Sequence, residues 1–258
     1  LSATPIPRTL QMAMGGVRNL SLIETAPVDR LAVRTYVSRK DDGLIRQAVL
    51  RELGRGGQVF YVHNRVSSIA AVARRLEELV PEARVAVAHG QMNEHELERV
   101  MVDFVAGDTN LLLCTSIIES GLDITNANTM LINRADTFGL SQLYQLRGRV
   151  GRSHRRAYAY LMISGEKPVT EEAARRLGVL KDLDELGSGF RVAAHDMEIR
   201  GAGNLLGREQ SGHMMAIGFD LYMRMMEEAV QELRGQQVGP SVEPEIDLGA
   251  EAYLPESY

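Results

Sequence analysis

Arginines gather at one place in this chain, in the stretch QLRGRVGRSHRR over residues 145–156, and no acid occurs between Asp136 and Glu166. Guanidinium groups bind phosphate oxygens in pairs of hydrogen bonds, so a nucleotide phosphate and a nucleic-acid backbone are candidate ligands, with plain solvent as the third alternative. The net charge of −5 does not count against an anionic ligand. The tail from residue 237 onward holds five acids and no base, so the rest of the chain is formally neutral.

A second candidate site follows the apolar run NLLLC (110–114). The segment CTSIIESGLDI (114–124) places hydroxyls and acids just past this run, at Thr115, Ser116, Glu119, Gly121 and Asp123. Ligands of open parallel sheets bind beyond the carboxyl ends of strands, where hydroxyls can contact phosphates. Gly121 and Asp123 fit a simple turn equally well.

The run LYQL (143–146) predicts a helix before the next strand. We expect this helix to bring Arg149 and Arg152 onto one side, facing the sheet edge where phosphates bind.

The elements that must position these residues are short strands separated by amphipathic helices. Runs rich in branched or aromatic residues predict strands over 31–37, 58–64, 83–89, 110–116, 128–134 and 156–163. Apolar residues recur at helical spacing between the second and third runs, and again between the third and fourth. Intervals of roughly 25 residues with one helix each are typical of right-handed β-α-β units. The sequence therefore predicts an α/β fold, with a parallel sheet covered by helices on both faces.

Helical sequence dominates after residue 165. Residues 170–186 predict one helix, a glycine-rich stretch follows at 187–212, and residues 217–234 predict another helix. The last segment contains three prolines and reads as a linker. A second, smaller module is therefore expected after the sheet.

Composition restricts the class of protein. The chain is 45% hydrophobic and 24% charged, and it has no apolar run near the roughly 20 residues that span a bilayer. No export signal begins the sequence, so a cytoplasmic location and no membrane contact are expected. The single Cys114, within LLLC, is expected to be a buried thiol. The histidines lack metal-ligand spacing, so no metal site is expected in this chain.

Five segments resemble motifs III, IV, IVa, V and VI of superfamily 2 helicases and translocases, in the same order and with matching separations. They are SATPIPRTL (2–10), FYVHNRV (60–66), AHGQM (88–92), TSIIESGLDI (115–124) and QLYQLRGRVGRS (142–153). The resemblance covers nearly the whole chain and is closest to the group that contains RecG and the bacterial transcription-repair-coupling factors (Mfd).

The distal part of the chain also resembles that group. FRVAAHDMEIRGAGNLLGREQSG (190–212) resembles its translocation motif, which is a helical hairpin followed by a loop. The continuation HMMAIGFDLYMRMMEEAV (213–230) resembles the coupling factors rather than RecG.

The resemblance implies a RecA-like fold and four parts. These are the end of motif III with an inter-lobe linker (1–19), a carboxyl-terminal motor lobe (20–165), a helical-hairpin translocation module (166–235) and a linker to an absent domain (236–258). It also implies an ATP-dependent translocase on double-stranded DNA that displaces stalled RNA polymerase and couples transcription to nucleotide excision repair. Contacts with the polymerase and the repair proteins are expected outside this span.

Part of the motor is missing from the sequence. The chain contains no G-x-x-x-x-G-K-[ST] loop and no Asp-Glu box that would hold magnesium, so a first RecA-like lobe would have to complete the site for ATP with Mg²⁺. The chain alone is therefore not expected to hydrolyse ATP.

The resemblance assigns roles to individual residues. Arg149 and Arg152 are expected to reach the γ-phosphate as arginine fingers, and Glu119, Gly121, Asp123 and Gln145 to contact the nucleotide. The residues expected to contact DNA or to couple hydrolysis to movement are Arg176, Arg200, Gln210, Thr115, Ser116, His89 and Gly90. Arg147, Arg155 and Arg156 stay open between structural contacts and exposure to solvent. Backbone contacts predict DNA binding that is independent of sequence and sensitive to salt.

Two other functions remain open. A RecG-like enzyme would remodel branched DNA, and a binding module would dock a partner or nucleic acid without nucleotide chemistry. A Rossmann-type oxidoreductase is excluded, because no G-x-G-x-x-G lies between an early strand and helix.

Overall fold

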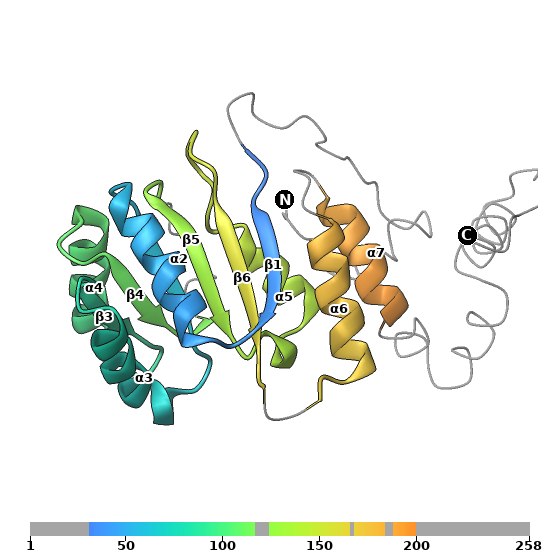
Figure 1. Ribbon diagram of the computed structural model, residues 1–258, viewed down its shortest axis with the longest axis horizontal. Coiled ribbons are helices and arrows are strands. Elements are labelled where there is room, and N and C mark those ends of the chain that lie inside the picture. Colours follow the sequence, from blue (N-terminus) through green and yellow to red (C-terminus); the bar gives the residue numbers. More distant parts are fainter. Residues whose placement is uncertain (1–30, 117–123, 166–167, 184–187, 200–258) are drawn as a thin grey trace, which may run out of the picture.

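A single parallel sheet forms the centre of the protein. The computed structural model describes residues 31–116, 124–165, 168–183 and 188–199 (Figure 1). Its six strands run parallel in the order β1-β6-β5-β2-β4-β3. They are β1 (Arg34–Arg39), β2 (Gln58–Val62), β3 (Val85–Ala88), β4 (Leu111–Cys114), β5 (Ala127–Asn133) and β6 (Tyr158–Ile163).

The six predicted strands are all present, with ends that differ from the expected ones by at most three residues. Every residue of β2, β4 and β5 is buried, because these central strands are covered on both faces. Strands covered on both faces are continuous apolar runs rather than alternating ones, which is why they were visible in the sequence. The predicted α/β fold is confirmed.

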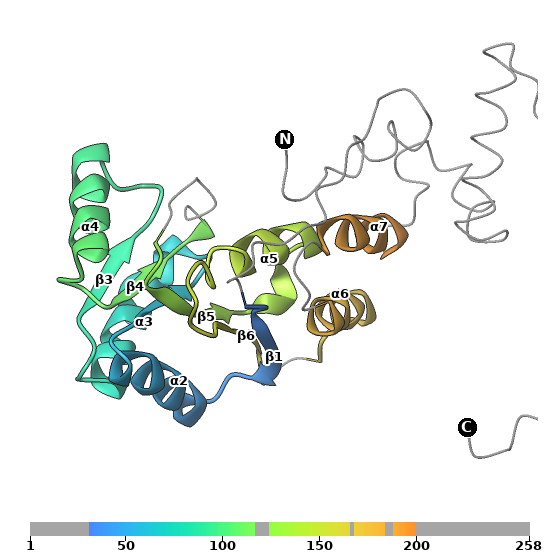
Figure 2. The same ribbon diagram turned by 90° about the horizontal axis from the view of Figure 1, so that it is seen from above.

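Helices cover both faces of the sheet (Figure 2). They are α2 (Asp42–Gly54), α3 (Val66–Leu79), α4 (Glu94–Ala106), α5 (Leu140–Arg147), α6 (Glu171–Asp182) and α7 (Gly189–Ile199), with the short 3₁₀ helix η2 (Ala135–Thr137). On one face, α2 and α3 share an apolar cluster with Tyr61 of β2. On the other, the remaining helices share a cluster in which the rings of Phe60 and Phe104 lie 5.4 Å apart.

Side-chain caps define where three helices begin. Asp41 Oδ1 accepts from Leu44 N at 2.8 Å before α2, and Asn93 Oδ1 accepts from Glu96 N at 2.8 Å before α4. Thr170 caps α6 in the same way. Such caps satisfy amide groups that lack a partner inside the helix.

Helices α6 and α7 follow the sheet; α6 packs against β1 and α5, and α7 packs against α5 and α6. Leu177 and Leu180 of α6 and Val192 of α7 belong to the same apolar cluster as Leu143 of α5. Within the described ranges these helices therefore share the core of the sheet, and a module boundary at residue 165 remains a prediction. The predicted helix over 217–234 and the predicted linkers at 1–19 and 236–258 lie outside the described residues. No helix in the described part is long and apolar enough to cross a membrane.

Candidate functional site

Polar residues line the carboxyl ends of four neighbouring strands. Because the sheet is parallel and these strands are adjacent in the order β5-β2-β4-β3, their ends form one continuous edge. We call this set the carboxyl rim, and it consists of Asn133 at the end of β5, His63 and Asn64 after β2, Thr115 and Ser116 after β4, and His89 and Gly90 after β3. The predicted DNA-contacting residues of motifs IVa and V thus lie on one edge, beside His63 and Asn64 of motif IV.

His63 is held at the centre of the carboxyl rim by hydrogen bonds from both ring nitrogens. Its Nδ1 lies 2.9 Å from Nδ2 of Asn133, and its Nε2 lies 2.8 Å from Oγ of Ser68. Burial lowers the pKa of His63, and the nearby charges of Lys40 and Arg65 lower it further. The ring is therefore neutral near pH 7, and this part of the rim presents hydrogen-bonding groups rather than charge.

The two hydroxyl residues after β4 differ in exposure. Thr115 is buried, and its amide donates to Ala88 O at 3.2 Å, which ties β4 to the end of β3. Ser116 Oγ donates to Oδ1 of the exposed Asn64 at 3.3 Å. Ser116 and Asn64 can therefore offer hydrogen bonds to a phosphate oxygen, whereas Thr115 has a structural contact.

His89 follows β3 at the outer end of the carboxyl rim. Its amide lies 3.4 Å from Sδ of Met92, and its Nδ1 is buried without a hydrogen-bond partner among the described residues. Gly90 beside it is exposed.

The arginine-rich segment is placed differently from the expectation. Helix α5 ends at Arg147, so the prediction that it carries Arg149 and Arg152 on one side is wrong. The helix ends because Arg149 N bonds to Leu146 O at 2.9 Å in a tighter turn, and because Gly151 has a φ of 75°, which a right-handed helix does not contain. Residues 148–157, which we call the arginine loop, lead instead to the amino end of β6, at the sheet edge opposite the carboxyl rim. Arg149 and Arg152 are both half-buried in this loop.

Two of the three arginines whose roles were open make structural contacts. Arg147 is 5% exposed, donates to Leu180 O at 2.9 Å and lies over the ring of Tyr144. It therefore joins α5 to α6. Arg155 Nη1 donates to Arg55 O at 2.6 Å, while the side chain of Arg156 is exposed.

Arg176 links α6 to the segment that follows β5. Its Nη2 donates to Asp136 O at 3.3 Å, and its Nη1 donates to Glu172 at 3.0 Å. Sequence reasoning did not single out Arg134, which is exposed directly after Asn133 and pairs with Asp136 at 3.2 Å. Arg134 has a φ of 56°, which is uncommon for a non-glycine residue. Its position as the last residue of the predicted strand 128–134 was the only signal available.

The structure says less about the remaining predicted site residues. Gln145 is half-buried on α5, whereas Glu119, Gly121, Asp123, Arg200 and Gln210 lie outside the described residues. In the described ranges, no three His, Cys, Asp or Glu side chains are grouped as a metal site requires.

Comparisons with known proteins agree with this arrangement. Residues 42–154 match the family described as helicase conserved C-terminal domain. The whole chain is 56% identical over 258 residues to the transcription-repair-coupling factor of Myxococcus xanthus, and 54% identical over 264 residues to that of Escherichia coli strain K12. It covers 22% and 23% of these two proteins, so the chain spans about a fifth of their length.

Solved structures give the same result. RecG bound to a three-way DNA junction superimposes with a TM-score of 0.65 and 35% identity, over 79% of this chain and 27% of RecG. Dbp5 of S. cerevisiae, bound to RNA and ADP BeF3, has a TM-score of 0.52 over 77% of this chain and 54% of Dbp5; at 18% identity it shows the fold alone. The fold is thus the RecA-like fold of helicase carboxyl-terminal lobes. The chain belongs to the superfamily 2 helicases and translocases, in which it matches a segment of the transcription-repair-coupling factors.

Proposed function

We propose that this chain is the second motor lobe of an ATP-dependent translocase on double-stranded DNA, which displaces stalled RNA polymerase and couples transcription to nucleotide excision repair. The observation that carries the proposal is the identity of 54–56% over the whole chain to transcription-repair-coupling factors of distant bacteria. The opposite edges occupied by the carboxyl rim and the arginine loop support it, because a motor lobe needs both a surface for DNA and cations for a nucleotide.

The arginine loop supplies the charge for catalysis in this proposal. ATP with Mg²⁺, bound mainly by a first lobe, supplies the phosphoryl group and the metal. Arg149 and Arg152 meet the charge that develops on the transferred phosphoryl, and they are suited to this because guanidinium groups stay protonated at all physiological pH values. Arginine fingers of other NTPases raise the rate by about 10³–10⁵. Glu119, Gly121, Asp123 and Gln145 are proposed to contact the nucleotide from the same chain.

In this proposal the carboxyl rim binds the DNA backbone. Ser116 and Asn64 offer hydrogen bonds to phosphate oxygens, and His89 and Gly90 extend the surface along the edge. Phosphate contacts carry no sequence information, so binding should be independent of sequence and weaken as salt rises. Arg176, Arg200 and Gln210 are proposed to couple hydrolysis to movement, and polymerase and repair proteins to bind regions outside this chain. The location proposed is the cytoplasm.

The test uses Arg152→Ala in the full-length protein. DNA-stimulated ATP hydrolysis should fall by about 10³-fold or more, while ATP still binds, because the fingers act on the transition state. Arg74→Ala, which changes an exposed arginine on α3, is the control and should keep full turnover. Unchanged turnover in Arg152→Ala would refute the role of the loop. The isolated 258-residue chain should show no measurable DNA-stimulated hydrolysis.

A RecG-like enzyme acting on branched DNA is the second candidate, because RecG is the solved structure at 35% identity. The two functions differ in substrate. Displacement of a stalled RNA polymerase by the full-length protein supports coupling, whereas branch migration of a three-way junction without displacement supports the RecG-like function. Neither activity, together with no nucleotide-dependent closure of the lobes, would indicate a binding module.

A further inference from the structure

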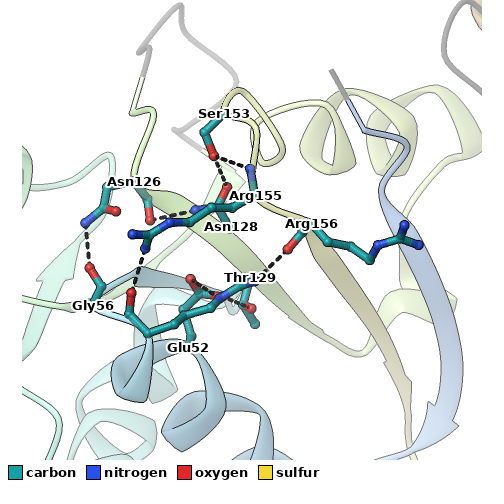
Figure 3. A network of polar contacts seen from close by, with 9 residues as sticks. Glu52, Gly56, Asn126, Asn128, Thr129, Ser153, Arg155 and Arg156 are labelled. Carbon is teal, nitrogen blue, oxygen red and sulfur yellow. Dashed lines mark hydrogen bonds and ion pairs between the residues drawn. The ribbon is translucent and has the colours of Figure 1, made fainter. Parts of the chain in front are cut away.

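A buried carboxylate lies next to the arginine loop at the amino edge of the sheet (Figure 3). Glu52, near the end of α2, is 0% exposed. It accepts hydrogen bonds from Nε of Arg55 at 3.0 Å, from Nη2 of the same guanidinium, and from the hydroxyl of Thr129 in β5. A buried carboxylate is tolerated only when its oxygen atoms have such partners. Glu52 therefore fixes the plane and position of the Arg55 guanidinium.

Arg55 and the arginine loop hold each other through backbone carbonyls. The remaining nitrogen of the Arg55 guanidinium, Nη1, donates to Arg156 O at 2.8 Å. In return, Arg155 Nη1 donates to Arg55 O at 2.6 Å. Arg55 also lies over the ring of Tyr158, 5.5 Å from its centroid. Two segments about one hundred residues apart in the sequence are thus joined by a reciprocal pair of charge-assisted hydrogen bonds.

A second set of contacts joins the loop to the start of β5. Ser153 Oγ donates to Asn128 Oδ1 at 2.9 Å and accepts from the amide of Arg155 at 3.3 Å. Asn126 Nδ2 donates to Gly56 O at 3.0 Å, which returns the network to the end of α2. Figure 3 shows that these side chains converge from α2, β5 and the loop. We call this network the amino-edge clamp, and its members are Glu52, Arg55, Gly56, Asn126, Asn128, Thr129, Ser153, Arg155 and Arg156.

The other end of the arginine loop is also fixed. Val150 is fully buried, and Gly151 packs so closely that a Cβ there would lie 3.0 Å from Val33 Cγ2 and 3.1 Å from Ala157 Cβ. Arg152 follows Gly151 directly and precedes Ser153 of the clamp. Its backbone is therefore held on both sides.

We propose that Glu52, Arg55 and Arg155 are positioning residues for ATP hydrolysis, because they hold the arginine loop in the one arrangement from which Arg152 reaches the nucleotide. This inference rests on the proposed function of the loop. A cation that is already in place when charge develops needs no reorganisation during the reaction, which is why preorganised groups stabilise a transition state more than mobile ones. Glu52 and Arg55 lie outside all the helicase motifs recognised in the sequence.

The first experiment is Arg55→Gln in the full-length protein, with steady-state ATP hydrolysis measured at saturating DNA. We expect kcat to fall by about 10- to 10²-fold, because a misplacement of about 1 Å in a catalytic group costs up to the larger factor. The KM for ATP and the Kd for DNA should change less than about twofold, because the clamp is proposed to act only in the transition state. Hydrogen exchange at residues 148–157 should become faster. Arg51→Gln is the matched control, since Arg51 is an exposed arginine of α2 that stacks on the same Tyr158 ring, and it should keep kcat.

A second variant separates positioning from stability. Arg55→Gln leaves Glu52 buried without its ion partner, which destabilises the fold by itself. In the double variant Glu52→Gln with Arg55→Gln, both charges are gone and two amides can pair, so the unfolding midpoint should recover toward wild type. No guanidinium is left to hold Arg156 O, so kcat should stay low.

The outcomes are distinct. Wild-type kcat in Arg55→Gln, or kcat that recovers together with stability in the double variant, overturns the clamp as a positioning device while the function of the loop stands. If wild-type protein lacks DNA-stimulated hydrolysis, or if Arg152→Ala leaves it unchanged, the proposed function fails and this inference fails with it.

Discussion

Gly57 should be intolerant of even one added methyl group. A Cβ at this position would lie 1.8 Å from Oε1 of Glu52, 2.7 Å from its Cδ and 3.1 Å from its Cγ. Oε1 and Cδ of Glu52 thus occupy the space that a side chain at position 57 would need, and Glu52 is held there by its contacts with Arg55 and Thr129. Gly57→Ala should therefore expel Glu52 from its buried site and separate it from Arg55 and Thr129.

The size of the effect follows from what Glu52 loses. Expelling Glu52 leaves the guanidinium of Arg55 and the buried hydroxyl of Thr129 without their acceptor, and breaking a buried ion pair in this way costs about 3–5 kcal/mol. For a chain of this size each kcal/mol lowers the melting temperature by about 2–4 °C, so the expected decrease is on the order of 10 °C. Gly54→Ala is the control, since apart from its chain neighbours and the backbone of its own helix no atom lies within 4 Å of its Cβ position at the end of α2. Alanine there should leave stability unchanged or raise it by up to about 1 kcal/mol.

The assays are thermal and urea unfolding of the purified chain, each followed by circular dichroism. A double-mutant cycle identifies the cause, because adding Gly57→Ala to Glu52→Ala should cost little once the carboxylate is absent. If the free energy of unfolding of Gly57→Ala lies within about 1 kcal/mol of the wild-type value, the buried position of Glu52 is wrong and so is the basis of the clamp.

Two further predictions concern the carboxyl rim and the core. The lowered pKa of His63 means that, below its ordinary value of 6.5, the unfolded chain binds more protons than the folded one. The free energy of unfolding should therefore fall as pH decreases from 6.5 toward the pKa of His63 in the folded protein. His63→Gln should reduce that loss, as measured by urea titrations at pH 7.5 and 5.5. An identical pH dependence in the variant and the wild type would contradict this prediction. Burial raises the pKa of the Cys114 thiol, so a disulfide reagent should label this single cysteine only after unfolding, and fast labelling of native protein would disprove the packing.

The strands were predictable largely because four of the six lie inside the sheet, between the edge strands β1 and β3. Residues such as Leu112 and Ile132 have no access to water, and this requirement leaves apolar runs that are visible without a structure. The position of the carboxyl rim also followed from sequence, since residues after parallel strands share an edge. The sequence did not show that Thr115 is buried while Ser116 is more exposed, because burial depends on how the folded chain surrounds each residue.

The arginine loop shows why helical spacing misled the prediction. Arg149 and Arg152 are three residues apart, which matches one turn of a helix, but Gly151 takes up a left-handed conformation between them. Charge spacing alone does not distinguish a helix from a loop when glycine interrupts it.

The amino-edge clamp could not be predicted from the sequence, for a different reason. Glu52 looks like an ordinary acid near the end of an amphipathic helix, and only the chain folding around it buries it against Thr129. Helix α2 itself was not singled out in the sequence, although Asp41 provides a cap for it.

The strand order has a consequence for how the protein is made. Of the six described strands β1 is synthesised first, yet its one neighbour among them is β6, which is synthesised last. In a nascent chain that ends before residue 158, β1 therefore lacks its partner β6, even if β2 to β5 have already paired with one another. Pairing across so long a sequence separation is slow. The pairing of β1 with β6 completes the sheet, and it also fixes the arginine loop that leads into β6. A newly synthesised lobe in which Arg149 and Arg152 are mobile should therefore be one in which this pairing has not yet formed.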